Sequence, residues 1–401
     1  MAQILIPENP MERNVLAAIR SFGRKGHKID IAYPVGKTNS KRLYIEKLLK
    51  SRYIRHINYI PDPLITPDDF IAHIIRLVKK RNYDLLMPFT SKTFPLISLH
   101  SKELKKYTKL ICSDFDTYSK ANDKERITSI AAKLGLAVPN SICPATINDL
   151  KKQIPLLDFP VVVKARVNSG MQKGLRYAHD RDELISAYSE ISQQQSIKGL
   201  KEFNRPVVQE IIPGKIYDAL YYYHNGELVA FLTQCREVTN PLSGGPGVQN
   251  ITVKDGKLFN YGKILLDALN WHGPAQVEVK LDPRDNKYKL LEVNPKFWGT
   301  LDLSIKCGVN FPVIALDLAF CGKLQADINQ NFGEGLRYRW LVSFIEAYRE
   351  AWVSTMGVIR RLINKVEFND LVYKDFGPTL YYVLLAAIEF FRNSNKLKKV
   401  E

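Results

Sequence analysis

The strongest constraint on the fold is a pair of apolar segments, PAQVEVKLD (274–282) and KYKLLEVN (287–294), joined by a short polar turn. Their length and their partly alternating pattern are typical of strands, and the short connection favours an antiparallel hairpin. In the second segment, Glu292 and Asn294 are two positions apart and therefore lie on one face. Because a carboxylate on a buried strand requires a partner, the hairpin predicts a specific partner for Glu292.

A hairpin centred on Asp285 pairs Glu278 with Glu292 and Gln276 with Asn294. Two carboxylates directly opposite each other on a sheet repel, and a divalent cation between them relieves the repulsion. Carboxylate and amide oxygens suit Mg²⁺ or Mn²⁺ completed by water and phosphate, which makes Glu278, Glu292 and Asn294 the predicted metal ligands. The alternative is a shifted register in which either glutamate pairs with a lysine on the solvent side. In the favoured register, the opposite face holds the apolar residues Val277, Val279, Leu291 and Val293.

Residues 1–115 alternate between strand patterns and amphipathic helix patterns. The strands are QILIP, KIDIAYP, YDLLMPF and KLICSD, and the helices are ERNVLAAIRSFGRKGH and TPDDFIAHIIRLVKKRN. This alternation predicts a small parallel sheet covered by helices, and hence an α/β fold class that becomes α+β over the whole chain. No GxGxxG follows the first strand, so a dinucleotide site there has no support.

The middle of the chain places basic residues where an anion can bind. Lys164 ends the apolar strand FPVVVK, and a loop containing Gly170 and Gly174 follows it. Exposed amides of such loops bind phosphate. Lys124 lies near the start of a helix predicted over residues 116–135, where a cation does not favour the helix dipole. The alternative for both lysines is a solvated position.

The strand VVQEII carries Gln209 and Glu210 just before an apolar pair. The edge of such a strand is suited to an adenine base. Main-chain groups would contact the ring, and Glu210 would accept a hydrogen bond from the amino group.

In this order, the segments resemble the ATP-grasp superfamily over roughly residues 1–325. The most specific motif is LLEVNPKFWG, which usually reads Glu-x-Asn-Pro-Arg in that family. Its Phe-Trp-Gly continuation and the following LDLSIKCGVNFP look like the carbamoyl-phosphate-synthase-like and D-aspartate-ligase-like branch of the carboxylate–amine ligases. The resemblance implies four regions: a pre-ATP-grasp α/β domain (1–115), an ATP-grasp small subdomain (116–200), a catalytic subdomain (201–325) and a helical C-terminal extension (326–401).

The resemblance also implies a role for each candidate residue. ATP phosphates would be contacted by Lys124, Lys164 and the loop at Gly170. Adenine would be bound by Gln209, Glu210 and the main chain of Ile212, with Asp218 at the ribose. Mg²⁺ would be held by Glu278, Glu292 and Asn294. Further phosphate or carboxylate contacts, with catalytic roles, would come from Arg236 and Lys296.

The implied reaction joins a small-molecule carboxylate to an amine through an acyl phosphate, with ATP and Mg²⁺ (or Mn²⁺) as cofactors. Lys296 departs from the family pattern, because lysine is a point charge and cannot clamp an anion with two parallel hydrogen bonds. Two alternatives stay open. One is an ATP-binding module or scaffold with little ligase activity. The other is an enzyme that uses bicarbonate in carboxylation or carbamoyl-phosphate-type chemistry.

The charge balance favours anionic partners, since 58 Lys and Arg stand against 41 Asp and Glu and give a formal net charge of +17. The basic residues are dispersed without a nucleic-acid motif, so no nucleic acid is expected. Five scattered cysteines with no CxxC pair exclude an obvious disulfide framework and favour a reducing, cytoplasmic location.

The last apolar run, LYYVLLAAIEFF (380–391), is followed by basic residues. It is too short to span a bilayer. Two alternatives remain for this helix. It could lie on the inner membrane surface as a peripheral contact, or it could pack against the rest of the protein or a second subunit of a homodimer. Packing is the favoured prediction.

Overall fold

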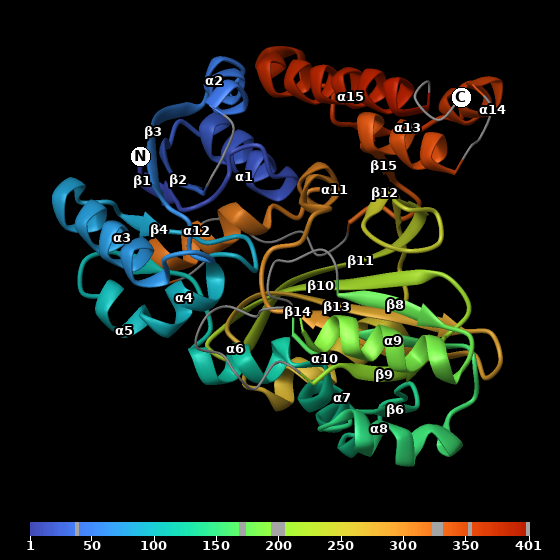
Figure 1. Ribbon diagram of the computed structural model, residues 1–401. Coiled ribbons are helices and arrows are strands. Elements are labelled where there is room, and N and C mark those ends of the chain that lie inside the picture. The colour runs from blue at the N-terminus through green and yellow to red at the C-terminus, as the bar shows by residue number, and fades with distance from the viewer. Residues whose placement is uncertain (37–39, 168–173, 194–204, 323–331, 352–354, 398–401) are drawn as a thin grey trace.

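The computed structural model describes residues 1–36, 40–167, 174–193, 205–322, 332–351 and 355–397 (Figure 1). Its strands form three sheets. The first is a five-stranded sheet near the N-terminus, the second has four strands, and the third has seven strands and carries the hairpin.

The N-terminal sheet confirms the predicted parallel α/β unit. Its strands lie in the order β3-β2-β1-β4-β5, and each pairing is parallel. The bounds are β1 Gln3–Ile6, β2 Lys28–Val35, β3 Ile54–Pro61, β4 Leu85–Leu86 and β5 Lys109–Leu110. Strand β3 has no counterpart among the predicted strands, because it is an edge strand with several polar and only partly buried side chains.

Helices cover both faces of this sheet (Figure 1). On one face, the apolar stripe of α1, with Val15, Ile19 and Phe22, packs together with α12, which comes from a distant part of the sequence. On the other face, Phe70 and Ile74 of α3 complete a second core. The bounds are α1 Arg13–Arg24, α2 Ser40–Leu48, α3 Pro67–Arg81, α4 Phe94–Leu99, α5 Ser101–Leu104 and α12 Phe311–Cys321.

The four-stranded sheet is antiparallel, in the order β6-β9-β7-β8. Its strands and the helices around it are β6 Ser141–Ile142, β7 Val161–Lys164, β8 Leu175–Ala178, β9 Val207–Glu210, α6 Phe115–Asn122, α7 Lys124–Lys133, α8 Ile147–Gln153, η1 Ile154–Leu156 and α9 Arg181–Ser192. The single helix predicted over 116–135 is wrong. The side chain of Asp123 accepts hydrogen bonds from the backbone N–H groups of Glu125 and Arg126, so a new helix begins there.

The seven-stranded sheet has the order β14-β13-β10-β11-β12-β15-β16. Helix α10 packs on β10 and β11. The bounds are β10 Ile216–His224, β11 Glu227–Thr239, β12 Gly247–Thr252, β13 Gly273–Asp282, β14 Lys287–Asn294 and α10 Gly256–Ala268. The predicted register of the hairpin is confirmed, because Glu278 lies opposite Glu292 and Gln276 lies opposite Asn294.

The prediction for Leu291 is wrong. The register shifts between Glu278 and Val279, so that Val279 pairs with Leu290. This bulge leaves Leu291 only partly buried, and Leu290 joins Val293 in the core instead. A bulge inserts one residue into a strand, and that insertion exchanges the faces of the residues beyond it.

The described part of 326–401 is mainly helical, which confirms the prediction, but two short strands interrupt it. Strand β15 pairs antiparallel with β12, and β16 pairs parallel with β15, so both extend the large sheet. The remaining bounds are α11 Leu301–Lys306, β15 Arg337–Arg339, α13 Leu341–Glu350, α14 Thr355–Ile363, β16 Phe368–Asn369, η3 Tyr373–Asp375 and α15 Phe376–Leu397.

The C-terminal helix α15 packs against α2 and α13, and therefore against the N-terminal domain (Figure 1). Just before it, Asp375 pairs with Arg20 at 2.8 Å and accepts hydrogen bonds from Ser51 and the backbone of Arg52. This contact agrees with the packing alternative for the last helix. Within the described ranges, no helix is long and apolar enough to cross a membrane.

Candidate nucleotide and metal site

Three carboxylates form a row across neighbouring strands of the large sheet. Asp218 on β10 lies opposite Glu278 on β13, and Glu278 lies opposite Glu292 on β14. Like charges in adjacent positions of a sheet repel unless cations lie between them. The contacts of this carboxylate row therefore define the site.

At one end of the row, Arg236 of β11 separates Asp218 from Glu278. Its Nη2 lies 2.6 Å from Oδ1 of Asp218 and 2.8 Å from Oε1 of Glu278. Its Nη1 donates to the carbonyl of Gly245 at 2.9 Å, which ties the arginine to the loop between β11 and β12. These two carboxylates raise the pKa of Arg236 above its ordinary value despite burial.

The predicted ribose contact of Asp218 is wrong. The residue has no exposed surface, and its oxygens also accept hydrogen bonds from Gln234 (2.9 Å) and Gln276 (3.0 Å). A side chain enclosed in this way has no surface to offer a sugar hydroxyl. Asp218 instead positions Arg236, and Gln234 is a member of the site that sequence reasoning missed. The one feature that could have identified Gln234 is its position on β11, where it lies directly opposite Asp218 of β10.

At the other end of the row, a single amide bridges the two glutamates. Nδ2 of Asn294 donates to Oε1 of Glu278 at 2.9 Å and to Oε1 of Glu292 at 3.0 Å. Nζ of Lys124 contacts the second oxygen of Glu292 at 3.0 Å. Burial raises the pKa of Glu278 to about 7, and the repulsion of Glu292 adds to this. The positive charge of Lys124 holds the pKa of Glu292 at about 2 against the effect of burial.

The donor set fits a divalent cation. Glu278 and Glu292 approach the same amide nitrogen of Asn294, so their oxygens already converge on one small volume. A rotation of that amide would turn its oxygen toward the same place. Among the described residues, no three His, Cys, Asp or Glu side chains are grouped as a metal site. Two carboxylates and an amide need additional oxygens, which is the usual situation for Mg²⁺ bound together with phosphates.

Lys164 and Gln209 lie together at the facing edges of β7 and β9. Nζ of Lys164 donates to Oε1 of Gln209 at 2.7 Å, and the amide of Gln209 donates to Ser141 at 3.0 Å. Burial lowers the pKa of Lys164 to about 8, with Lys124 contributing by repulsion. The predicted phosphate loop begins directly after this lysine. Its Gly170 lies outside the described residues, while Gly174 accepts a hydrogen bond from the backbone of Ala165.

The predicted adenine contacts lie at the end of β9. Glu210 accepts from Arg284 at 3.0 Å and from the backbone N–H of Asn140 at 2.9 Å. The carbonyl of Ile212 accepts from Lys280 at 2.8 Å. Arg284 and Lys280 were not among the predicted site residues, because nothing in their local sequence distinguishes them from surface cations. The adenine assignment of Glu210 and Ile212 stays a prediction.

Lys296 lies between the hairpin and the N-terminal domain. Burial lowers its pKa, and the carboxylates of Glu292, Glu278, Glu8 and Glu12 oppose that effect. Glu8 is buried and accepts hydrogen bonds from the backbone N–H groups of Phe89 and Thr90, both at 2.8 Å. The N-terminal domain therefore supplies negative charge close to the one position that departs from the family motif. Sequence reasoning missed Glu8, which is separated from Lys296 by most of the chain.

The sequence is similar to those of several known proteins. Residues 202–344 match a family model described as "ATP-grasp in the biosynthetic pathway with Ter operon". The D-aspartate ligase of Enterococcus faecium is 26% identical over 305 residues, which cover 71% of this chain and 69% of that protein. The carbamoyl phosphate synthase large chain of Thermoanaerobacter pseudethanolicus is 23% identical over 292 residues, but this chain spans only 26% of its length.

Solved structures show the same fold. A biotin carboxylase from Campylobacter jejuni superposes with a TM-score of 0.65 at 15% identity, covering 84% of this chain and 74% of that one. An L-amino acid ligase from Bacillus licheniformis gives a TM-score of 0.63 at 18% identity, covering 82% and 78%.

The fold is that of the ATP-grasp proteins to which the chain is similar. The matches agree with the resemblance to the ATP-grasp superfamily drawn from LLEVNPKFWG. The predicted enzyme class, an ATP-dependent ligase that forms C–N bonds, is the class of several of these relatives.

Proposed function

We propose that this protein uses ATP and Mg²⁺ to activate a small carboxylic acid and joins it to an amine. The observation that carries the proposal is the convergence of Glu278 and Glu292 on one amide group of Asn294, with Lys124 in contact with Glu292. Opposed carboxylates flanked by cations are suited to a metal-bound polyphosphate, because each charge of the substrate meets a charge of opposite sign.

In this proposal, Glu278, Glu292 and Asn294 hold Mg²⁺, which would neutralise charge on the transferred phosphoryl group. Lys124 and Lys164 contact the phosphates, and Lys164 would exchange its bond to Gln209 for a phosphate oxygen. Glu210 and Ile212 receive the adenine at the end of β9. Gly170 remains part of the proposed phosphate loop.

The chemistry proceeds by two displacements. An oxygen of the substrate carboxylate attacks the γ-phosphorus of ATP, and ADP leaves. The nitrogen of the amine then attacks the acyl carbon, the bond to the phosphate oxygen breaks, and the amine loses a proton as the amide forms. The contribution of the chain is positioning and charge neutralisation by Lys296 and Arg236, with Arg236 fixed by Asp218.

The relatives suggest amino-acid-like substrates, since one is named a D-aspartate ligase and a structural neighbour an L-amino acid ligase. Lys296 favours the competing function, an ATP-binding protein with little ligase activity, because lysine cannot form the two parallel bonds of the usual arginine. Bicarbonate is the third candidate substrate, prompted by the carbamoyl phosphate synthase relatives.

One screen separates these functions. ADP release would be measured with Mg²⁺ and ATP against a matrix of amino acids and other carboxylic acids, each with and without amines. We expect ADP release that requires one acid and one amine together. Bicarbonate-dependent release without an organic acid would favour carboxylation-type chemistry. ATP binding without ADP release from any pair would contradict the ligase proposal.

A further inference from the structure

Lys124 is the first residue of α7, although a cation at the N-terminus of a helix is electrostatically unfavourable. The residue is also largely buried, with 8% of its surface exposed. Its Nζ lies 3.0 Å from Glu292 of the carboxylate row, so the position of α7 directly affects the proposed metal and nucleotide site. The contacts that hold the start of this helix therefore matter for function.

A buried ion pair holds the start of α7. Asp123, which is 1% exposed, caps the helix, because its Oδ1 accepts from the backbone N–H groups of Glu125 at 3.0 Å and of Arg126 at 3.2 Å. The same carboxylate accepts two hydrogen bonds from Arg166, with Nε 2.8 Å from Oδ1 and Nη2 2.7 Å from Oδ2. Arg166 is 3% exposed, and its two parallel bonds are an arrangement that a lysine cannot form.

Arg166 also connects α7 to the strand that carries the second lysine. Its carbonyl accepts a hydrogen bond from the backbone N–H of Lys124 at 2.9 Å, and Asp123 forms an isolated antiparallel bridge with Val167. Lys164, the last residue of β7, lies only two residues before Arg166. The two lysines proposed to bind phosphate are therefore attached to the two sides of one junction, which consists of main-chain bonds and the pair between Arg166 and Asp123.

This junction has to resist repulsion between the two lysines. Burial lowers the pKa of Lys164, and the charge of Lys124 lowers it further. The charges of both lysines also lower the pKa of Glu292 against the effect of burial, so both ammonium groups lie near the same carboxylate. Two cations held together inside a protein favour an anion that carries several negative charges. The spacing of the two cations then determines how well such an anion is bound.

We propose that Arg166 and Asp123 are positioning residues, which set the spacing of Lys124 and Lys164 for the phosphates of one nucleotide. Neither residue of the pair touches the nucleotide. The carboxylate of Asp123 fixes the first turn of α7, and the guanidinium of Arg166 ties that carboxylate to the end of β7. The inference rests on the proposed function, because both lysines act there as phosphate contacts.

Asp123→Asn tests the pair, because asparagine still caps a helix but carries no charge. Arg166 keeps a contact of 2.9 Å with Glu125, so its charge retains a partner in this variant. The measurement is calorimetric titration of the full chain with ATP and Mg²⁺, and separately with adenosine, which has no phosphates. We expect an affinity for ATP that is weaker by about ten- to a hundredfold, the usual loss when a group that orients a ligand-binding residue is changed. The affinity for adenosine should be unchanged.

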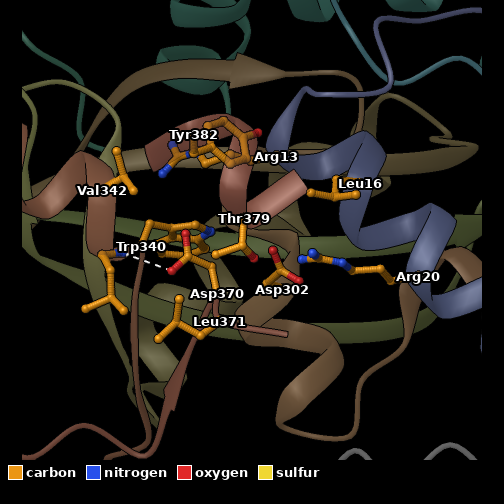
Figure 2. Close-up of a pocket in the computed structure, with 11 residues that line it drawn as sticks. Arg13, Leu16, Arg20, Asp302, Trp340, Val342, Asp370, Leu371, Thr379 and Tyr382 are labelled. Carbon is orange, nitrogen blue, oxygen red and sulfur yellow. Dashed lines mark hydrogen bonds between the residues drawn. The ribbon is translucent and has the colours of Figure 1, made fainter. Parts of the chain in front are cut away.

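Two control variants separate positioning from general stability. Asp375→Asn also breaks a buried pair, between Asp375 and Arg20 at 2.8 Å, and the side chains of the two pairs are almost equally buried. Figure 2 shows Arg20 at a pocket beside α1, and among the described residues that line this pocket none is a proposed ATP contact. Asp180→Asn changes the cap of α9, where Oδ1 accepts from two backbone N–H groups at 2.9 Å. Both controls should bind ATP as the wild type does.

If Asp123→Asn does not fold, Arg166→Lys decides, because lysine keeps the charge but loses the two parallel bonds, and it should also weaken ATP binding. Wild-type affinity for ATP in the folded variant would overturn the inference and leave the proposed function standing. An equal loss of affinity for ATP and adenosine, or an equal loss for ATP in Asp375→Asn, would show a purely structural role and also overturn it. No binding of ATP by the wild type would overturn the proposed function, and the inference with it.

Discussion

Arg236 and Glu278 are joined by a contact of 2.8 Å between Nη2 and Oε1, and the same nitrogen lies 2.6 Å from Asp218. The guanidinium therefore links a fully buried carboxylate to Glu278, one of the three proposed metal ligands. Its position is set from behind by Asp218, which is fully buried. The first prediction therefore concerns the stability of the protein rather than its catalysis.

Asp218→Asn should lower the free energy of unfolding by about 3 kcal/mol, because it removes one charge from a buried pair and keeps the shape of the side chain. Urea unfolding of the two proteins measures the difference. The variant should also lose ATP turnover, since Arg236 would no longer be held. Unchanged stability would show that Glu278 and Gly245 alone fix the arginine.

Glu292→Gln should reduce Mg²⁺-dependent ATP turnover by about a hundredfold or more, because a ligand of the proposed metal is lost while the volume is conserved. Steady-state ADP release over a range of Mg²⁺ concentrations checks this. Glu227→Gln, at the exposed start of β11, is the matched control and should behave as wild type. Equal turnover in the two variants would reject Glu292 as a metal ligand.

Lys296→Arg should retain or raise ligase turnover, because arginine adds a second hydrogen bond to an anion at the same place. Lys296→Gln removes the charge and should lose activity. Both are measured by ADP release with the best acid and amine pair from the screen. A loss of activity in the arginine variant would instead mean that this site, with Glu8 and Glu12 close by, is adapted to the smaller cation.

The stability of the protein should fall as the pH rises from about 4.5 to about 7. In the folded state, the pKa of Glu278 is raised to about 7 from 4.5, so the folded state holds more protons than the unfolded state in this window. The free energy of unfolding then decreases with pH, by on the order of 2 kcal/mol from this group. Glu278→Gln should lack this part of the slope. Parallel pH profiles for the two proteins would contradict the shift.

Asp375→Asn should destabilise the protein by about 3 kcal/mol and accelerate proteolysis next to α15. The carboxylate is 3% exposed and accepts from Arg20, Ser51 and the backbone of Arg52. Asp116→Asn is the control, because that side chain is 72% exposed in its pair with Lys120 and contributes little. Similar unfolding curves for the two variants would show that the C-terminal segment is held by apolar contacts alone.

The hairpin was predictable because its register depends on local rules. Side chains alternate between the two faces of a strand with a period of two residues. Together with the short turn, this alternation determines that Glu278 lies opposite Glu292. The bulge at Leu291 was not predictable, since one inserted residue leaves the apolar pattern nearly unchanged. The pairing of Asp218 with Arg236 depends on the order of strands β13-β10-β11 in the sheet, which the sequence does not specify.

The charged residues that surround the site were the hardest part to predict from the sequence. Glu8 approaches Lys296 only because the N-terminal domain folds against the large sheet, and Arg284 approaches Glu210 only across two sheets. Strands β15 and β16 were missed for another reason. Each has three residues or fewer, too short to show a period.

The salt bridge between Arg20 and Asp375 has a consequence for synthesis on the ribosome. Arg20 belongs to α1, and Asp375 follows it by 355 residues, so the two can meet only after that long stretch of chain has been translated. Until then, the N-terminal domain carries a buried cation without its anion and an uncovered surface around α2. A nascent chain that stalls before residue 375 should therefore expose that surface to chaperones.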